Sequence, residues 1–536
     1  MVPMQPVRIN GNDLDFDELI AVVFEQRPVL LESFARESVE RARAVVENLL
    51  AGHRVAYAVN TGVGKLSDVR IVPEQIRELQ LNLLRSHAVG VGEPLSEPEV
   101  RAMLLLRANS LAKGNSGVRP IVIETLCEML NRGVHPVVPS QGSVGASGDL
   151  APLAHLALVL IGEGEAFYSG EPGKKPRRKG DPASRRISGA DAMKRAEIPP
   201  LVLEAKEAIS LINGTQAMLA VGTLTLRAAE IMIDSADAIA ALSLDALRGT
   251  DVAMDDRIQK ARPHPGQLRS AQNIRKMLEG SEIRESHRQC GRVQDAYSLR
   301  CIPQVHGAVR DTLAHCRQVF EIEMNSAVDN PLVFAGPKQI GKREDDAAGD
   351  VISGGNFHGQ PLAFALDFLA IALSSLAGIS ERRIERLVNP SLNEELPPFL
   401  AQGAGLNSGF MMAQVTAAAL ASENKVLAHP ASVDSITTSG NKEDYVSMGM
   451  AAAIKLKKVV QNTRNVLAIE AMASAQAIDF LAPLKLGKRG QRAYDRIRAV
   501  SKKLEQDRII ADDFERVAEV IASGKIAAAL DGESYY

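Results

Sequence analysis

The chain contains no tryptophan, and aromatic residues make up only 4% of its 536 residues, although 46% of the residues are hydrophobic. The hydrophobic content is therefore mostly alanine, leucine, valine and isoleucine, which suit closely packed helices better than a β-sandwich. A chain of this length can bury several layers of core or more than one domain. The composition favours a large protein of the all-α class.

Cysteine is also scarce. The four cysteines form no CxxC pair and no disulfide framework, which is typical of a reducing compartment; they are Cys127, Cys290, Cys301 and Cys316. The first residues, MVPMQPVRINGNDLDF, match neither a signal peptide nor a transit peptide. We therefore expect a cytoplasmic protein.

An excess of one charge sign is missing as well. The formal net charge is −3, so no basic field indicates nucleic-acid binding. Two long uncharged runs, 211–226 and 397–422, contain several Asn, Gln, Ser, Thr or Pro residues. Both runs are too polar for a membrane interior, and we expect no membrane partner.

Helical periodicity lengthens after the first 200 residues. Apolar residues recur at three- and four-residue spacing over 203–247, 306–324, 360–387, 410–427 and 447–480. Long alanine-rich helices of this kind predict a mostly antiparallel bundle. We expect an N-terminal region over 1–200, a central helical bundle over 201–480 and a C-terminal helical region over 481–536.

Two segments interrupt this pattern. Residues 169–195 are basic and rich in Gly, Pro and Ser, which favours a solvated loop over an anion-binding patch. Residues 343–350, REDDAAGD, predict a second exposed loop.

The stretch 141–155, QGSVGASGDLAPLAH, is the most informative part of the chain. Glycine lacks a Cβ and tolerates strained dihedrals, so the amide nitrogen of Gly148 can close onto the carbonyl of Ala146. Loss of water from the Ser147 side chain then leaves an exocyclic methylidene, an electrophile that no encoded side chain supplies. Asp149 suits an N-cap, and the apolar run predicts a helix over 150–160 whose positive end would face the ring. A plain glycine-rich turn is the alternative.

This context resembles the aromatic amino acid ammonia-lyases, whose prosthetic group 4-methylideneimidazol-5-one (MIO) forms from the same tripeptide. The resemblance is collinear from about residue 57 to residue 480. It implies an MIO formed autocatalytically from Ala146, Ser147 and Gly148. It also implies a nearly all-helical fold of the fumarase/aspartase-like type, in which a smaller MIO-bearing region caps a long central bundle. Members of the family are homotetramers with active sites assembled from three chains.

The segment 57–65, YAVNTGVGK, superficially matches a phosphate-binding loop. Val59 occupies the first glycine position and Leu66 replaces the Ser/Thr, so that interpretation fails. The segment resembles instead the lyase loop whose tyrosine removes the β-proton of the substrate, which makes Tyr57 the expected base. A free tyrosine has a pKa of about 10, so nearby donors or positive ends must favour its charged form.

Three further segments supply the remaining candidates. A guanidinium can grip an α-carboxylate through two hydrogen bonds, and the resemblance of 294–301, QDAYSLRC, gives that role to Arg300. It also places Gln294 and the catalytic Tyr297 in the site. In LINGTQ, 211–216, polar amides lie inside an otherwise apolar helix, where Asn213 is a packing residue or, by resemblance, a neighbour of the MIO carbonyl. SGGNFH, 353–358, resembles the segment that places Phe357 beside the MIO, and because His358 lacks a second ligand at metal spacing we expect no metal.

Substrate choice depends on fewer residues. Ser86-His87 occupies the selectivity position, where histidine-specific members resemble Ser-His, although some aminomutases do too. An imidazole substrate needs polar partners, which His87 and Glu443 can provide as ring neighbour and carboxylate acceptor. The resemblance therefore implies the histidine ammonia-lyase branch, which converts L-histidine to trans-urocanate and ammonia. A tyrosine or phenylalanine ammonia-lyase, or an MIO-dependent 2,3-aminomutase, is the alternative.

Overall fold

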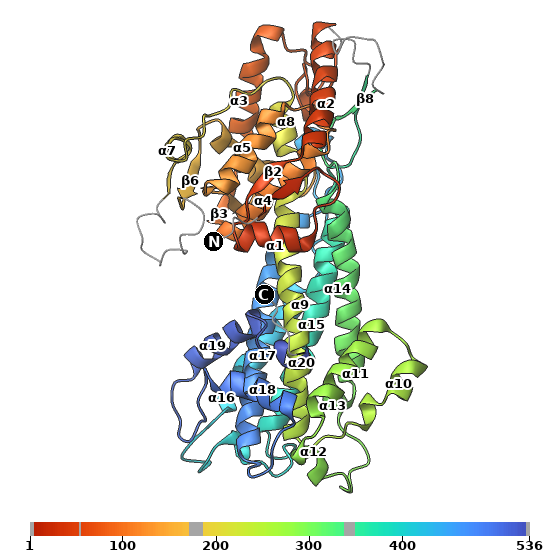
Figure 1. Cartoon of the computed structure of the whole chain (residues 1–536), viewed down its shortest axis with the longest axis vertical. Helices are drawn as coiled ribbons and strands as arrows, with labels where there is room; N and C mark the ends of the chain where they lie inside the picture. The colour runs from red at the N-terminus through yellow and green to blue at the C-terminus, as the bar shows by residue number, and fades with distance from the viewer. Residues whose placement is uncertain (1–4, 53–54, 171–185, 337–348, 532–536) are drawn as a thin grey trace. The chain divides into compact units, whose positions relative to one another are not determined.

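The computed structural model describes residues 5–52, 55–170, 186–336 and 349–531. The chain divides into two compact units, each built from three separate stretches. Unit 1 comprises Met1–Leu224, Gln318–Phe364 and Ala431–Ile454, and unit 2 comprises Thr225–Arg317, Ala365–Pro430 and Lys455–Tyr536. Both units are mainly helical (Figure 1), which confirms the predicted fold class. The division into 1–200, 201–480 and 481–536 stays a prediction.

Unit 1 combines short helices with small sheets. The strand pair β1–β2 is parallel, whereas β3–β5, β4–β6–β7 and β8–β9 are antiparallel. Helix α4 begins where the Glu99 carboxylate accepts hydrogen bonds from the backbone and hydroxyl of Ser96, and almost all of its side chains are buried. The elements are β1 (Val7–Ile9), α1 (Phe16–Phe24), β2 (Val29–Leu31), α2 (Ser33–Ala51), α3 (Ile76–His87), β3 (Val91–Pro94), α4 (Glu97–Ala112), α5 (Pro120–Asn131), β4 (Val134–Pro136), β5 (Pro139–Gln141), α6 (Leu150–Leu160), β6 (Glu165–Tyr168), β7 (Ile187–Ser188), α7 (Gly189–Arg195), α8 (Glu207–Ile212), β8 (Leu332–Ala335) and β9 (Gly349–Ile352).

Four long helices contribute residues to both units: α9 (Gln216–Ala246), α14 (Ile302–Met324), α15 (Gln360–Val388) and α17 (Gly449–Asp479). The other helices of unit 2 are α10 (Asp256–Ala261), α11 (Pro265–Leu278), α12 (Glu282–Ser286), α13 (Tyr297–Arg300), α16 (Met411–Leu427), α18 (Lys488–Arg498), α19 (Ala511–Ala522) and α20 (Ala528–Asp531).

Hydrogen bonds define how the helices of unit 2 run. On α14, Arg310 donates to Asp234 of α9, and about two turns later Arg317 donates to Glu230, so α9 and α14 are antiparallel. Helix α16 runs antiparallel to α15, because Ser374 of α15 donates to the Asn424 carbonyl and Gln414 of α16 donates to Glu381. Helix α17 then lies parallel to α15. Two successive contacts along the α15–α17 pair show this: Thr463 donates to the Leu373 carbonyl, and further along both helices Arg383 donates to Glu470.

Two helices are long and apolar enough by composition to cross a membrane, α9 and α15. In the structure, 78% and 61% of their most apolar windows are buried inside the protein. The core helices of a bundle have the same property, so these helices are weak grounds for a membrane span.

Three expectations need correction or restriction. The range 203–247 is not one helix, because α8 ends at Ile212 and α9 begins at Gln216. Within 169–195, residues 171–185 lie outside the described residues, and the end of the segment forms β7 and α7 rather than a loop. Within 343–350, residues 343–348 lie outside the described residues, and Asp350 belongs to strand β9. The predicted helix over 150–160 is confirmed as α6.

Candidate active site

The Ala146-Ser147-Gly148 tripeptide lies directly before α6 in unit 1. Gly148 has φ +71°, a left-handed conformation, and its backbone pairs with Gly214 in an isolated bridge. A Cβ at Gly148 would lie 2.0 Å from the Gly214 carbonyl oxygen. Only glycine fits this position, because any other side chain would collide with the facing backbone.

The break between α8 and α9 holds this tripeptide in place. Asn213 follows the last residue of α8, so its amide does not lie inside a helix as predicted. Its Nδ2 donates to the Ser147 carbonyl at 3.0 Å, and the Gly214 carbonyl accepts from the Asp149 N–H at 2.7 Å. Helix α8 does not continue past Asn213, because Gly214 adopts φ +152°, and this leaves the Gly214 carbonyl free to accept from the Asp149 N–H.

Asp149 occupies the N-cap position of α6, but its carboxylate does not cap that helix. One oxygen accepts from the Ser143 hydroxyl, and the other accepts from the backbone N–H of Met218 in the first turn of α9, both at 2.8 Å. Burial raises the pKa of Asp149 to about 6, although these hydrogen bonds oppose the shift. The carboxylate therefore ties the tripeptide to the start of α9.

Glu443 contacts the Ser147 side chain directly. The Ser147 hydroxyl donates to Oε1 of Glu443 at 2.8 Å, and the Thr438 hydroxyl donates to Oε2 at 2.7 Å. The Thr438 N–H also donates to the Glu443 carbonyl at 2.9 Å. Thr438 thus holds both the backbone and the side chain of Glu443, and the second carboxylate oxygen faces Ser147.

His87 ends helix α3 near this carboxylate. Its Nδ1 lies 2.8 Å from the Leu83 carbonyl, which can only accept, so Nδ1 carries the proton and Nε2 keeps its lone pair. Burial lowers the pKa of His87, while the Leu83 hydrogen bond and the charge of Glu443 act in the opposite direction. Burial therefore favours the neutral ring, on which the charge of Glu443 acts electrostatically.

Tyr57 lies in a turn that contacts the Glu443 segment. Its phenolic oxygen accepts from the Gly64 N–H at 3.0 Å. Gly64 opens the 3₁₀ helix η1 (Gly64–Leu66), and a Cβ there would lie 3.0 Å from Ser439 Oγ in η7 (Ser439–Asn441). The loop that carries Tyr57 therefore adjoins the segment that leads into Glu443.

Phe357 lies half-buried in the turn before α15. A Cβ at Gly359 would lie 2.7 Å from Met218 Sδ, and Met218 also faces Gly145, which brings this turn to the start of the tripeptide loop. The neighbouring His358 stacks on Tyr445, with ring centroids 6.1 Å apart. Among the described residues, no three His, Cys, Asp or Glu side chains are grouped to hold a metal ion.

Gln294, Tyr297 and Arg300 belong to unit 2, whereas Ser147 and its partners belong to unit 1. Tyr297 opens α13 and is 70% exposed. The guanidinium of Arg300 lies 4.5 Å from the centre of its ring, a cation–π contact. The Arg300 guanidinium and the Tyr297 side chain are thus in contact with each other.

The sequence profile of the aromatic amino acid lyases matches residues 14–499. The chain belongs to the aromatic amino acid lyase family. Histidine ammonia-lyase of Koribacter versatilis (strain Ellin345) is 68% identical to this lyase over 527 residues, which cover 98% of this chain and 99% of that protein. The crystal structure of histidine ammonia-lyase from Trypanosoma cruzi matches with a TM-score of 0.86 at 40% identity, over 98% of this chain and 95% of that one. Tyrosine aminomutase from Streptomyces globisporus matches with a TM-score of 0.88 at 36% identity, over 99% of each chain.

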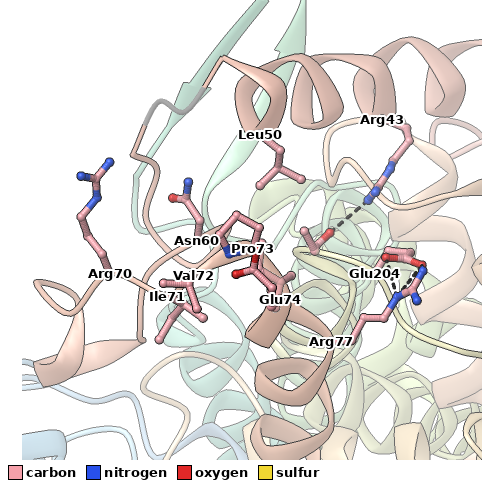
Figure 2. A pocket seen from close by; sticks show the side chains of 12 residues that line it. Arg43, Leu50, Asn60, Arg70, Ile71, Val72, Pro73, Glu74, Arg77 and Glu204 are labelled. Carbon is pink, nitrogen blue, oxygen red and sulfur yellow. Dashed lines mark hydrogen bonds and ion pairs between the residues drawn. The ribbon is translucent and has the colours of Figure 1, made fainter.

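A pocket of 690 Å³ lies beside the Tyr57 loop of this lyase (Figure 2). Its cations already have partners: Arg43 donates to the Ala205 carbonyl, and Arg77 forms an ion pair with Glu204 at 2.6 Å. The pocket is lined by Arg43, Leu50, Asn60, Arg70, Ile71, Val72, Pro73, Glu74, Ile76, Arg77, Glu204 and Ala205. None of these is a predicted site residue, so the candidate site is the cluster around Ser147.

Sequence reasoning missed three residues that build this cluster: Ser143, Met218 and Thr438. Ser143 lies within the quoted motif, and its hydroxyl was a detectable signal. The roles of Met218 and Thr438 depend on contacts between segments that are distant in the sequence. Local sequence patterns do not predict such contacts.

Proposed function

We propose that this lyase deaminates L-histidine to trans-urocanate and ammonia. The observation that supports this best is the carboxylate of Glu443, which is hydrogen-bonded to Ser147 and interacts electrostatically with His87, whose pKa is lowered by burial. The imidazole of the substrate offers an N–H donor to Glu443. When the second nitrogen of the substrate ring is also protonated, it can donate to the Nε2 lone pair of His87. A phenyl ring offers neither, and covering these half-buried acceptors with a ring that lacks donors is unfavourable. The names of the relatives support the same substrate.

We also propose that Ala146, Ser147 and Gly148 form an MIO. The local structure fits: Gly148 has no room for a Cβ, Ser147 presents its hydroxyl to a carboxylate, and Asn213 fixes the Ser147 carbonyl. When formed, the MIO supplies an electrophile for the substrate amine. Asn213, which donates to the Ser147 carbonyl, and Gly214, whose carbonyl accepts from the Asp149 N–H, would hold the ring in place.

The protein residues supply the rest of the reaction. Tyr57 takes the β-proton, the electrons of the Cβ–H bond form the Cα–Cβ double bond, and the Cα–N bond breaks to release ammonia. The Gly64 N–H holds the phenolic oxygen in place for this role. His87 and Glu443 orient the ring so that the β-carbon faces the base.

We propose that Arg300 binds the substrate carboxylate, with Gln294 and Tyr297, in a cytoplasmic homotetramer whose sites combine several chains. The exposure of Tyr297 and its stacking with Arg300 support this assignment. Hybrid tetramers of Ser147→Ala and Arg300→Ala chains test it. If different chains supply the two residues, mixing two inactive variants restores activity, because some sites are intact. If one chain supplies both, no hybrid is active.

The substrate is tested by comparing urocanate, cinnamate and coumarate formation from histidine, phenylalanine and tyrosine. Urocanate should dominate. Cinnamate or coumarate as the main product would favour an aromatic lyase, and a β-amino acid would indicate an aminomutase.

A further inference from the structure

The break between α8 and α9 contacts the tripeptide on one side and a buried arginine on the other. Arg107 lies on α4 and is 0% exposed. Its Nη1 donates to the Asn213 carbonyl at 2.8 Å and to Oε1 of Gln216 at 2.9 Å. A single guanidinium nitrogen therefore spans the break, from Asn213, which follows the last residue of α8, to Gln216, the first residue of α9.

The same break holds both sides of Gly148. Asn213 donates to the Ser147 carbonyl, and the Gly214 carbonyl accepts from the Asp149 N–H. A Cβ at Gly214 would lie 2.5 Å from Arg107 Nη1, so the guanidinium packs directly against this residue. A displacement of the guanidinium would therefore move the backbone against which Gly148 lies.

Arg107 is poorly satisfied for a side chain that merely fills space. Among the described residues, neither its Nε nor its Nη2 has a hydrogen-bond partner. Its charged neighbours include Asp329, which is already paired with Lys206 at 3.0 Å. A buried cation with unused donors is costly, and an apolar residue of similar volume often serves stability as well or better. A role in positioning explains its presence.

We propose that Arg107 is the positioning residue for MIO formation: it fixes the Asn213–Gln216 break so that Gly148 lies in position to close the ring. This inference rests on the proposed MIO. It concerns how the ring is made, and it gives Arg107 no contact with the substrate.

Ring closure and dehydration remove two water molecules, so intact-protein mass measures the cyclised fraction without any activity assay. The experiment compares wild type, Arg107→Met and Arg107→Lys after a short expression pulse, followed by timed incubation. We expect Arg107→Met to fold and to cyclise about tenfold more slowly, because the break loses a charged donor. Arg107→Lys keeps a charge and a donor, and should restore part of the rate.

Arg101→Met is the matched control. Arg101 lies on the same helix, is 3% exposed, and donates to the carbonyls of Val22, Val23 and Leu130, away from the break. This variant should cyclise at the wild-type rate. Equal slowing in Arg101→Met and Arg107→Met would overturn the proposal, as would wild-type cyclisation in Arg107→Met.

Two results separate this inference from the proposed function. A wild-type chain without the two-water deficit would contradict the MIO itself. If Arg107→Met fails to fold, Gln216→Leu and Arg107→Lys decide, because each weakens the contact across the break. Full cyclisation at the wild-type rate in both would refute the role of Arg107.

Discussion

Glu443→Gln is the sharpest test of how the substrate ring is recognised. The amide keeps the shape of the side chain, and its oxygen can still accept from Ser147, so the chain should fold and cyclise. What the variant loses is the negative charge near His87. Exchanging a charged acceptor for a neutral one reduces a hydrogen bond from about 1.5–3 to about 0.5–1.5 kcal/mol.

The expected loss is therefore about 1–1.5 kcal/mol, or about 5- to 13-fold in kcat/KM for histidine. Glu443→Leu removes the acceptor entirely and should lose about 10- to 150-fold. Thr438→Val leaves the carboxylate but removes the donor that fixes Oε2. It should lose less than Glu443→Leu. The three variants form a graded series that follows the remaining strength and order of the acceptor.

The assay combines kcat/KM for histidine with inhibition constants for urocanate and cinnamate. Because Glu443 also contacts Ser147, its substitution can alter ring formation. Each rate is therefore divided by the fraction of chains that have cyclised, measured as the mass deficit of two water molecules. Urocanate should bind Glu443→Gln more weakly, whereas cinnamate, which has no ring N–H, should bind as before. A parallel loss for both inhibitors, or no loss for urocanate at full cyclisation, would refute direct recognition of the imidazole by Glu443.

Three other predictions follow from the site. Ser147→Ala should lack the two-water deficit, the near-ultraviolet band of the MIO and nearly all turnover while remaining folded; an active variant would contradict the assignment. Tyr57→Phe should lower kcat on every substrate, whereas His87→Phe should shift the ratio of kcat/KM from histidine towards phenylalanine, and unchanged ratios would contradict the role of His87 in selectivity. Glu323 accepts from Thr215 at 2.5 Å, and burial raises its pKa from 4.5 to about 7. Its unfolded form loses a proton first as pH rises, so the folded state is progressively destabilised between these values. At about pH 8, Glu323→Gln should raise the free energy of unfolding by up to about 3 kcal/mol and with it the thermal midpoint, whereas at about pH 4 it should change neither. An equal shift of the midpoint at both pH values would refute the link between this pKa and stability.

The sequence predicted the long helices that carry a periodic apolar pattern and the site residues that lie together in one motif. Periodicity found α15, α16 and α17 within a few residues, because each carries apolar residues at helical spacing over several turns. The same reasoning joined α8 to α9, since the apolar pattern continues through the break. Only the backbone shows that Gly214 leaves the helical conformation.

The site was predicted unevenly for a related reason. Ser147 and Gly148 could be found because neighbouring residues carry their chemistry, and Glu443 and His87 by resemblance alone. Asp149 was predicted to cap its own helix, yet its carboxylate accepts from the first turn of α9. A carboxylate before a helix can satisfy any nearby orphan N–H, and local sequence does not say which helix presents one.

The candidate site of unit 1 is built largely from the ends of helices, and this has a physical reason. A helix interior pairs its own backbone groups, whereas its ends leave N–H and carbonyl groups free for other partners. His87 is held by the last turn of α3, and Asp149 by the first turn of α9. Between α8 and α9, the Gly214 carbonyl remains free to accept from the tripeptide loop. A continuous helix over 203–247 would have used that carbonyl internally, so the helix break that periodicity missed is what allows the loop to be held.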